Sequence, residues 1–425
     1  MLRLRIAAFL GRLSGRVSQL LGRGGSAIPG LVGERIDPRL IEKLVGSLPV
    51  AVVTGTNGKT TTTKLLVGML EAGGMRVVTN HTGSNLARGV ATRLIEVARR
   101  GRIDAEVAVF EVDEAAVRGL GRRLLPEVVV VTNLARDQLD RYGELNTTAA
   151  HIRAALAHTA TAVLNADDPL VAGLAGTADA DVFFGGAAGV RAAMPDDRTL
   201  YGDEPVPRSG PEPDVLVAGA AADGDGQQVE LLIEGRPVSL RLQLPGVYNA
   251  YNAAGALLAA RVLEVEAETA LSAASGVEPA WGRGQVIHYE GRRVRLLLVK
   301  NPAGFNQAIR LLADVPGGAQ VMIAINDNIA DGRDVSWLWD ARVEDLAPTG
   351  HHYATSGIRA LDMAVRLKYA GIEAAWSEPD AAAALTRFVA TVPEGGTGYL
   401  VPTYTAMLDL LDLLQPGTHR REAWT

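Results

Sequence analysis

The sequence contains no cysteine, and this absence excludes several kinds of site at once. Without cysteine the chain forms no disulfide bond, holds no zinc ion through thiolates and has no thiol nucleophile of its own. Long hydrophobic runs are also missing, since no apolar stretch approaches the roughly 18–20 residues of a membrane-spanning helix. The N-terminus lacks the uninterrupted apolar core of a signal peptide, so the cytoplasm is the simplest compartment.

Neither sign of charge dominates the chain. Its 42 Lys and Arg residues stand against 48 Asp and Glu residues, which gives a net charge of −6 and no broad basic field. This balance argues against a nucleic-acid partner. The hydrophobic content of 48% is that of a soluble globular protein, and 425 residues exceed a single ordinary core, so we expect two or three domains.

A nucleotide-binding loop is predicted within residues 51–66, which read AVVTGTNGKTTTTKLL. The apolar run before the loop and the helical spacing after it predict a strand, a tight turn and a helix, in which Gly55 and Gly58 let backbone N–H groups approach a phosphate. Lys59 adds a charge that reaches the β- and γ-phosphates, and the Thr60 hydroxyl is placed to ligate Mg²⁺. The alternative is a chance Gly-Lys-Thr on a surface turn.

Residues 1–23 are typical of a basic amphipathic helix. Its apolar residues recur at helical spacing, and its five arginines lie elsewhere around the helix. Such a helix can rest on an anionic membrane surface, although docking onto the body of the same protein is the commoner arrangement. A Gly/Pro-rich linker over 22–33 ends it, so residues 1–46 form an N-terminal segment.

From Ser47 onward, strand and helix patterns alternate, which indicates a parallel, doubly wound α/β sheet. The predicted strands cover residues 50–53, 75–80, 104–112, 127–133 and 161–165. Glu111, Asp113 and Glu114 stand at the carboxyl end of the third of them, where ligands bind in open α/β sheets. Glu111 is therefore the candidate second Mg²⁺ ligand, and a solvated acid at a helix start is the alternative.

The pattern becomes β-rich between residues 181 and 244. Two alternating runs around Glu234-Gly235-Arg236 predict a β-hairpin, within an insertion packed beside the main sheet. A helix follows, with Asn249 and Asn252 in its first turn. Helix capping explains one asparagine, and a contact with a purine base explains the other. The predicted central domain therefore spans residues 47–280.

Residues 281–425 repeat the α/β pattern and predict a smaller, Rossmann-like domain. Its stretch 326–340, NDNIADGRDVSWLWD, places acids, amides and two tryptophans directly after a buried strand. Loops with such content usually have a function, although a surface loop anchored by its tryptophans explains the same composition.

Several of these motifs together resemble the Mur ligases, the ATP-dependent enzymes that build the peptidoglycan stem peptide. TGTNGKTTT, FEVDEA, TNLARDQLDRYGE, LNADDP, GVYNAYNAA and GRGQ occur in that family's order and spacing. The C-terminal motifs VKNPAGFNQAI, INDNIADGRDVSWLWD and VPTYTAML resemble one branch, the synthetase subunits of lipid II isoglutaminyl synthase. The resemblance implies a Mur-type P-loop ATPase domain followed by a Rossmann-like C-terminal domain.

The resemblance also implies a reaction. ATP with Mg²⁺ phosphorylates the D-Glu carboxylate in the stem peptide of lipid II, and ammonia then converts the acyl phosphate to D-isoglutamine. A separate GatD-like glutaminase supplies the ammonia, which agrees with a chain that has a phosphoryl-transfer site but no cysteine to hydrolyse glutamine. Lipid II is a membrane lipid, so the implied place of work is the cytoplasm, at the inner face of the plasma membrane.

Individual roles follow from the family pattern. Thr60 and Glu111 hold the metal, and Arg283 approaches the γ-phosphate from the interdomain cleft and stabilises its developing charge. The implied nucleotide site comprises Gly55, Thr56, Asn57, Gly58, Lys59, Thr60, Thr61, Asn249, Asn252 and Arg283. Asp340 matches an Asp that relatives are thought to contribute to the partner's Cys–His pair, and Asp334 is the second choice.

The sequence departs from the wider family at several positions. Mur ligases that add amino acids carry histidine where Gln138 and Tyr248 stand. Several also use a carbamoylated lysine for a second metal, yet no lysine lies between Lys64 and Lys300. The four-cysteine zinc ribbon of many relatives cannot form here, so we expect no zinc.

Two other functions remain as alternatives. The first is a stand-alone amino-acid ligase of the Mur or folylpolyglutamate type, which Gln138, Tyr248 and the missing lysine disfavour. The second is a non-catalytic ATP-binding scaffold for cell-wall enzymes, with the N-terminal helix and the acidic loop as docking surfaces. Intact Lys59, Thr60 and Glu111 argue against the scaffold.

Overall fold

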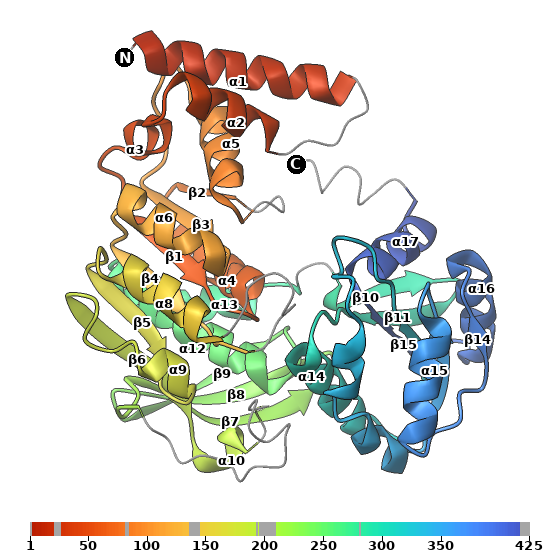
Figure 1. The fold of residues 1–425 in the computed structure, drawn as a ribbon. Coiled ribbons are helices and arrows are strands. Elements are labelled where there is room, and N and C mark those ends of the chain that lie inside the picture. Colours follow the sequence, from red (N-terminus) through yellow and green to blue (C-terminus); the bar gives the residue numbers. More distant parts are fainter. Residues whose placement is uncertain are drawn as a thin grey trace.

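The computed structural model describes residues 2–20, 27–80, 85–135, 145–192, 194, 210–279 and 282–416. Within these residues the chain forms two α/β units, each built on its own sheet, and the N-terminal helices lie at the far end of the first unit (Figure 1). No helix in the described ranges is both long enough and apolar enough to cross a membrane.

The central unit contains a nine-stranded sheet in the order β2-β3-β1-β4-β5-β6-β7-β8-β9. Its strands are β1 Val50–Thr54, β2 Val77–Thr79, β3 Val107–Glu111, β4 Val128–Val131, β5 Thr161–Asn165, β6 Ala180–Gly186, β7 Val215–Asp223, β8 Gly226–Ile233 and β9 Arg236–Leu242. Every pairing from β2 to β7 is parallel, and the pairings β7–β8 and β8–β9 are antiparallel. The predicted, mostly parallel sheet is confirmed.

Helices cover both faces of this sheet. They are α4 Lys59–Ala72, α5 Ala87–Val97, α6 Glu114–Leu124, α8 Leu145–Leu156, α9 Pro169–Ala172, α10 Ala188–Arg191, α12 Val247–Val262 and α13 Ala267–Ser275. Alternate residues of a strand point to opposite faces, so β1 contributes to two cores. Ala51 and Val53 pack with α4, α12 and α13, whereas Val50 and Val52 pack with α5, α6 and α8.

The predicted hairpin continues the main sheet and does not pack beside it. Strand β6 pairs in parallel with both β5 and β7, so β7, β8 and β9 extend one edge of the same sheet. The turn residues Glu234 and Gly235 have φ angles of 50° and 78°, as a two-residue hairpin turn requires. Because β7 pairs with β6, the backbone N–H and C=O groups along this edge of β6 form hydrogen bonds. A separate insertion would leave these groups unpaired.

The C-terminal unit has a six-stranded sheet in the order β10-β11-β15-β12-β13-β14. Its elements are β10 Arg283–Tyr289, β11 Arg292–Leu297, α14 Pro302–Ala313, β12 Gln320–Ala324, the 3₁₀ helices η1 Ser336–Trp339 and η2 Val343–Thr349, β13 His352–Ser356, α15 Ala360–Tyr369, β14 Ser377–Glu378, α16 Ala381–Thr391, β15 Thr397–Pro402 and α17 Tyr404–Leu414. Only the pairing of β10 with β11 is antiparallel. This is the small α/β domain that the sequence predicted.

Three helices precede the central sheet: α1 Leu2–Leu20, α2 Ile28–Ile36 and α3 Leu40–Val45. The predicted amphipathic helix forms and packs on α2 and α5. The expected linker over 22–33 is partly helical, because Pro29 occupies the first turn of α2, where a missing N–H costs nothing. Gly30 allows α2 to approach α5 so closely that a side chain there would overlap the carbonyl oxygen of Arg88.

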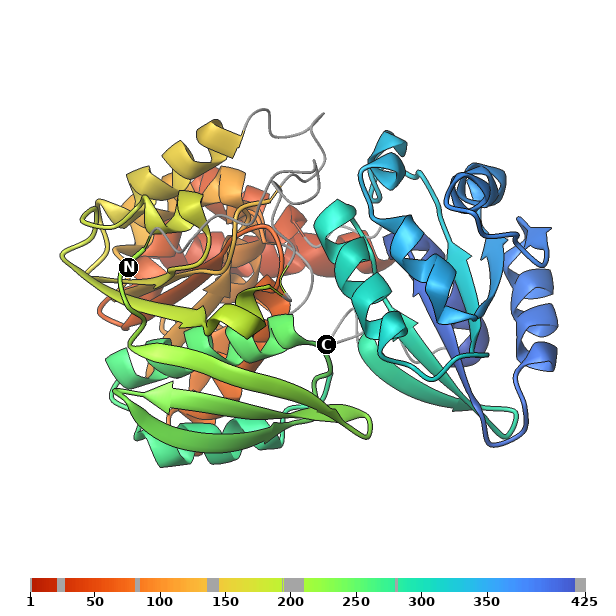
Figure 2. The same ribbon diagram turned by 90° about the horizontal axis from the view of Figure 1, so that it is seen from below.

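The two α/β units stand side by side, and α14 faces the central unit (Figure 2). Asp225, in the turn between β7 and β8, forms ion pairs with Arg293 and Arg295 on β11. The Asn301 amide donates a hydrogen bond of 3.2 Å to Asn57 Oδ1 in the nucleotide-binding loop. These contacts place one end of α14 directly at the predicted phosphate site.

Candidate active site between the two units

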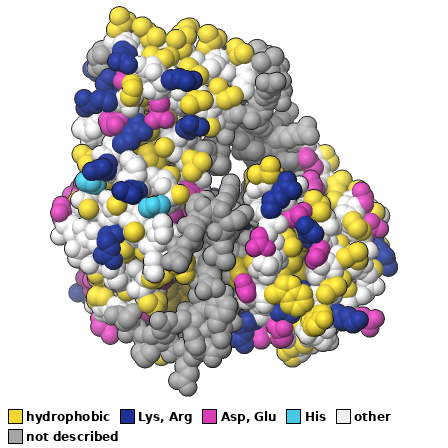
Figure 3. Space-filling model, in the orientation of Figure 1, with side chains coloured by type: hydrophobic (Ala, Val, Ile, Leu, Met, Phe, Trp, Pro, Cys, Tyr) yellow, Lys and Arg dark blue, Asp and Glu magenta, His cyan; other side chains and the backbone are white. Residues whose placement is uncertain are grey.

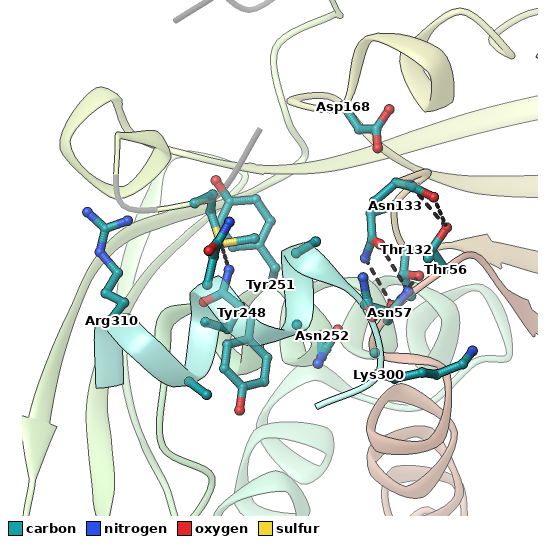
Figure 4. A pocket seen from close by; sticks show the side chains of 18 of the residues that line it. Thr56, Asn57, Thr132, Asn133, Asp168, Tyr248, Tyr251, Asn252, Lys300 and Arg310 are labelled. Carbon is teal, nitrogen blue, oxygen red and sulfur yellow. Dashed lines mark hydrogen bonds between the residues drawn. The ribbon is translucent and has the colours of Figure 1, made fainter. Parts of the chain in front are cut away.

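A cleft of about 1460 Å³ opens between the two units and is lined by residues of both (Figure 4). The central unit contributes the nucleotide-binding loop, the carboxyl ends of β3, β4 and β5, and the start of α12. The C-terminal unit contributes Arg283, Lys300 and the face of α14. The cleft is large enough for a nucleotide and a second substrate together, because ordinary small-molecule sites occupy roughly 300–1,000 Å³.

Both predicted loop glycines are required by the geometry. Gly55 and Gly58 have φ angles of 119° and 87°, a backbone region that residues with a side chain rarely adopt. A Cβ atom at Gly55 would overlap Thr132, and one at Gly58 would overlap Asn252. The first helical hydrogen bond of α4 runs from Thr62 N to Gly58 O, so the N–H groups of Thr60 and Thr61 lie in the first turn without a helical partner, where an anion can bind.

Side chains from the end of β4 hold the loop in shape. Asn133 accepts a hydrogen bond from Asn57 N at 3.0 Å and donates one to Asn57 O at 2.9 Å. The Thr132 hydroxyl donates to the same carbonyl at 2.7 Å, and the Thr56 hydroxyl bonds to the backbone of Ala135. Figure 4 shows these dashed contacts at one side of the cleft. The loop is therefore preorganised without a ligand.

Lys59 is buried and its ammonium group lies inside the loop. Its Nζ atom donates to Gly55 O at 2.5 Å and lies 3.3 Å from both carboxylate oxygens of Glu114. Glu114 is the first residue of α6, next to the helix-capping Asp113. Burial raises the pKa of Glu114, and the charge of Lys59 opposes that rise. Lys59 thus has a carboxylate counter-ion at the point where phosphates are expected.

Glu111 ends β3 and lines the cleft beside the loop. Asn80 fixes its backbone, since the Asn80 side chain accepts from Glu111 N and donates to Glu111 O, both at 2.8 Å. Thr61 also lines the cleft, whereas Thr60, the predicted magnesium ligand, is half-buried and does not.

The residues at this end of the cleft fit a magnesium ion that is held mainly by its substrate. Among the described residues no three His, Asp or Glu side chains are grouped as a metal cage. Mg²⁺ commonly takes one or two protein oxygens, several waters and the phosphates of a nucleotide. One carboxylate and one hydroxyl next to a phosphate loop match that donor set.

The two asparagines of α12 have different surroundings. Asn249 is fully buried, and its amide donates to Pro245 O at 2.7 Å and not into the cleft. Asn252 donates to Asn249 Oδ1 at 3.1 Å, lies against Gly58 and lines the cleft. No side chain caps the first turn of α12, so Asn249 ties the helix to the preceding turn, and only Asn252 is placed to meet a ligand.

Positive charge reaches the cleft from the C-terminal unit. Arg283 begins β10 and Lys300 follows β11, and both line the cleft opposite the nucleotide-binding loop. Tyr248 lies near Arg283. Burial raises the pKa of the Tyr248 phenol, and the Arg283 guanidinium opposes the rise, so the phenol stays neutral at physiological pH. A neutral phenol therefore lines the cleft beside Arg283.

The loop after β12 contains the predicted partner-directed aspartates, neither of which lines the cleft. Asp340 directly follows η1, and its carboxylate has no hydrogen-bond or ion-pair partner in the part of the chain that the structure describes. Asp334 instead accepts a hydrogen bond from Ser336 N at 2.8 Å, which lowers the pKa of its carboxyl group. Asp334 therefore stabilises the turn that begins η1, and Asp340 is the carboxylate left available.

An apolar surface adjoins Asp340. Trp339 is half-exposed and makes an edge contact with Tyr369 at a ring separation of 5.4 Å, while Arg366 lies over the Trp339 ring. Val365 and Leu361 are exposed about one and two turns before Tyr369 on α15. Trp337 points inward and packs on Phe305, so one tryptophan anchors the loop and the other faces solvent.

The structure adds site residues that the sequence analysis did not select. Glu114 was noted only as one of three acids, yet it pairs with Lys59. Asn301 lies in the NPAG motif, where it caps α14 through Gly304 N and reaches Asn57. Gln138 lies outside the described residues. Spacing alone could not identify these contacts, because each joins segments far apart in sequence.

The wall formed by the end of β5 is held by two aspartates. Asp167 accepts from Gly186 N at 2.6 Å and from the Tyr251 hydroxyl at 2.8 Å. Asp168 caps α9 and accepts from Leu134 N at 2.7 Å. Both line the cleft, and their hydrogen bonds fix its width at this side.

Comparison with protein families matches both units. Residues 53–260 match the Mur ligase middle domain, and residues 298–407 match the MurT ligase C-terminal domain. The chain is 30% identical to the MurT subunit of lipid II isoglutaminyl synthase (glutamine-hydrolyzing) from Streptococcus pneumoniae, over 95% of this chain and 96% of that protein.

Solved structures share the fold at low sequence identity. MurF from Acinetobacter baumannii aligns with a TM-score of 0.69 and 18% identity, over 90% of this chain and 80% of its own. MurF from Thermotoga maritima, solved in complex with ADP, aligns with a TM-score of 0.65 and 16% identity, over 90% and 83% of the two chains. Because the streptococcal relative spans nearly the whole sequence and family models match both units, the chain belongs to the MurT family of ATP-dependent, Mur-type ligases.

Proposed function

We propose that this chain amidates the D-Glu carboxylate in the stem peptide of lipid II, giving D-isoglutamine, with ATP as energy source and ammonia as nucleophile. The observation that carries the proposal is the single cleft in which a preorganised nucleotide-binding loop, with Lys59 and the nearby Glu111, faces Arg283 and Lys300 of the second unit. Relatives that match nearly end to end carry the name of this synthase.

The reaction has two steps. A carboxylate oxygen of D-Glu attacks the γ-phosphorus of ATP, the bond to the β-phosphate oxygen breaks, and ADP leaves an acyl phosphate behind. Ammonia then attacks the acyl carbon, loses a proton, and inorganic phosphate departs. The first step builds negative charge on the transferred phosphoryl group, so a site for it needs positive charge on more than one side.

The chain's residues supply those charges from both units. Lys59 neutralises the β- and γ-phosphates when it exchanges its Glu114 contact for the nucleotide, and backbone N–H groups at the start of α4 bind the same oxygens. Arg283, across the cleft, stabilises the transferred group. Glu111, which lines the cleft, and Thr60, in the first turn of α4 beside it, are the residues that would hold Mg²⁺, which when bound offsets phosphate charge.

We further propose that a GatD-like glutaminase docks on the apolar surface formed by Trp339, Leu361, Val365 and Tyr369. The chain has no cysteine with which to hydrolyse glutamine. Asp340, beside that surface and unpartnered among the described residues, orients the histidine of the partner's Cys–His pair and stabilises its charged form.

Mass spectrometry of lipid II tests the proposal directly. Lipid II is incubated with the purified chain, ATP, Mg²⁺ and an ammonium salt at mildly alkaline pH, and the product is fragmented to locate the exchange of a hydroxyl for an amino group at D-Glu. We expect amidation without any glutaminase. ATP consumption stimulated by a free amino acid, with that amino acid found in the product, would instead establish the stand-alone ligase.

A further inference from the structure

Helix α1 has two apolar faces, and the larger one points to solvent. The face against the body contains the buried residues Leu4, Ala7, Ala8 and Gly11, of which only Leu4 is large. The exposed face has large ones: Leu2, Ile6, Phe9, Leu10, Leu13 and Val17. Phe9 is 60% exposed and Leu13 46%, although neither lies at a frayed end. In Figure 3 hydrophobic side chains gather along the edge of the molecule where α1 lies.

Close packing explains why the inward face is made of small residues around Gly11 and Gly15. A Cβ atom at Gly11 would lie 2.9 Å from Pro29 O and 3.0 Å from the Ile95 side chain, and one at Gly15 would lie 2.9 Å from the Pro29 ring. The helix therefore docks on α2 and α5 mainly through small residues, with Leu4 as a buried large side chain near its start. The bulky stripe that gives this helix its amphipathic pattern is not used to hold it in place.

The exposed stripe is flanked by positive charge. Helix α1 contains four arginines and no acidic residue, in a chain whose net charge is −6. Arg12 donates to the last carbonyls of α5, Ile95 O at 2.8 Å and Ala98 O at 2.7 Å, and so fixes the helix. Arg16 is exposed and has no partner among the described residues.

We propose that the exposed face of α1 is a membrane-docking surface, which inserts Phe9, Leu13 and their neighbours between the headgroups of an anionic bilayer. A helix with large apolar residues on one side and arginines beside them binds such surfaces in the interfacial plane. A second copy of the chain is a poorer occupant, because a two-fold interface through this face would bring two sets of arginines together.

The inference deepens the proposed function, since a substrate with a lipid tail lies in a bilayer. It does not depend on the chemistry, because docking requires neither ATP nor a glutaminase. Helix α1 is part of the central unit, so its contact with a bilayer would hold the cleft-bearing domain at the membrane surface.

Co-sedimentation with vesicles tests the inference on the full chain. The probes are large vesicles of phosphatidylcholine alone, or with a third of phosphatidylglycerol, without lipid II. The expected result is binding to the anionic vesicles that weakens with added salt. Phe9→Gln with Leu13→Gln should weaken it about tenfold or more, because both side chains leave the bilayer. Arg16→Gln should weaken it about fivefold.

Leu125→Gln is the matched control, since Leu125 is 66% exposed at the end of α6, on another part of the central unit. It should bind vesicles as the wild type does. Equal binding by the wild type and the α1 double variant would overturn the inference, as would the absence of binding to anionic vesicles. Sedimentation velocity showing a dimer that the α1 double variant abolishes would assign the face to a second copy instead. Amidation of detergent-solubilised lipid II, measured on the same proteins, reports on the proposed function separately.

Discussion

The nucleotide-binding loop and the loop that ends at Asp340 differ in how their polar groups are satisfied. In the nucleotide-binding loop, Asn57 and Thr56 are bonded to the end of β4, and even Lys59 has a buried counter-ion. In the second loop, Asp340 has no partner among the described residues and the neighbouring Trp339 is half-exposed.

This difference indicates two kinds of site. A loop that binds a small anion gains from being rigid beforehand, because ordering it on binding would cost conformational entropy. A carboxylate that acts on another protein must stay unpaired until that protein arrives. The structure thus separates a site that is complete within the chain from one that is complete only with a partner. Four variants test that separation.

Lys59→Met should have the broadest effect, since it should impair both routes to the product. Losing the charge that faces the phosphates should lower amidation by about 10²–10³-fold or more, with glutamine and with ammonium alike, because both routes share the acyl phosphate. The measurement is the initial rate of product formation on the same preparation of the complex. Near wild-type rates would contradict the nucleotide-site assignment.

The same variant should show a pH-dependent loss of stability. Burial raises the pKa of Glu114 in the folded state, so its contribution to stability is fully present below the unfolded pKa and is lost as pH rises through the folded pKa. Without Lys59 the main charge that opposes this rise of the pKa is lost, and only a backbone hydrogen bond and the charge of Lys300 still oppose it. The melting temperature of Lys59→Met should therefore fall further below that of the wild type at neutral than at acidic pH. In the double variant Lys59→Met with Glu114→Gln, the loss of melting temperature relative to the wild type should no longer differ between neutral and acidic pH.

Asp340→Asn should separate the two sites. Glutamine-dependent amidation should fall by about 10³–10⁴-fold, the scale seen when the aspartate of a catalytic triad is neutralised. The ammonium-dependent rate should be unchanged, because the cleft is intact. Equal losses in both assays would place Asp340 in the ligase site or the fold. Asp334→Asn is the control, since asparagine keeps the hydrogen bond to Ser336 N, and it should preserve both rates.

Asn301→Ser isolates the contact between the units. Serine still caps α14 but is too short to reach Asn57, so the fold should keep its melting temperature while the cleft loses one interdomain hydrogen bond. We expect kcat/KM for ATP to fall about fivefold, as the loss of a single hydrogen bond of about 1 kcal/mol predicts. Asn301→Ala removes the cap as well, and should lower both the melting temperature and kcat/KM.

The smallest effect should come from Asp334→Asn on stability. The hydrogen bond from Ser336 N lowers the pKa of Asp334, so its extra stabilisation is present above the unfolded pKa and is lost as pH falls through the folded pKa. The wild type should therefore melt slightly higher than the variant at neutral pH and at the same temperature in strong acid. The melting temperatures of both proteins, measured by thermal unfolding from neutral pH to strong acid, test this expectation. A difference that persists in acid would show that charge is not the cause.

The sequence alone determined the elements that depend on local pattern. The apolar run and glycines around Lys59 predicted β1, the loop and α4, and the turn at Glu234-Gly235 predicted the hairpin of β8 and β9. These signals are local because backbone conformation and hydrophobic periodicity act over a few residues. The Rossmann-like pattern of the last third was readable for the same reason.

Tertiary structure alone decided which distant groups meet. Glu114 opposite Lys59, Asn301 against Asn57 and the extension of the sheet by β7 each depend on segments far apart in the chain. The same holds for α1. Its sequence favoured docking on the body of the same protein, and in the structure mainly small residues make that contact while the bulky apolar stripe faces solvent. Periodicity shows that a helix has a face, but only the space left by neighbouring helices decides which face is covered.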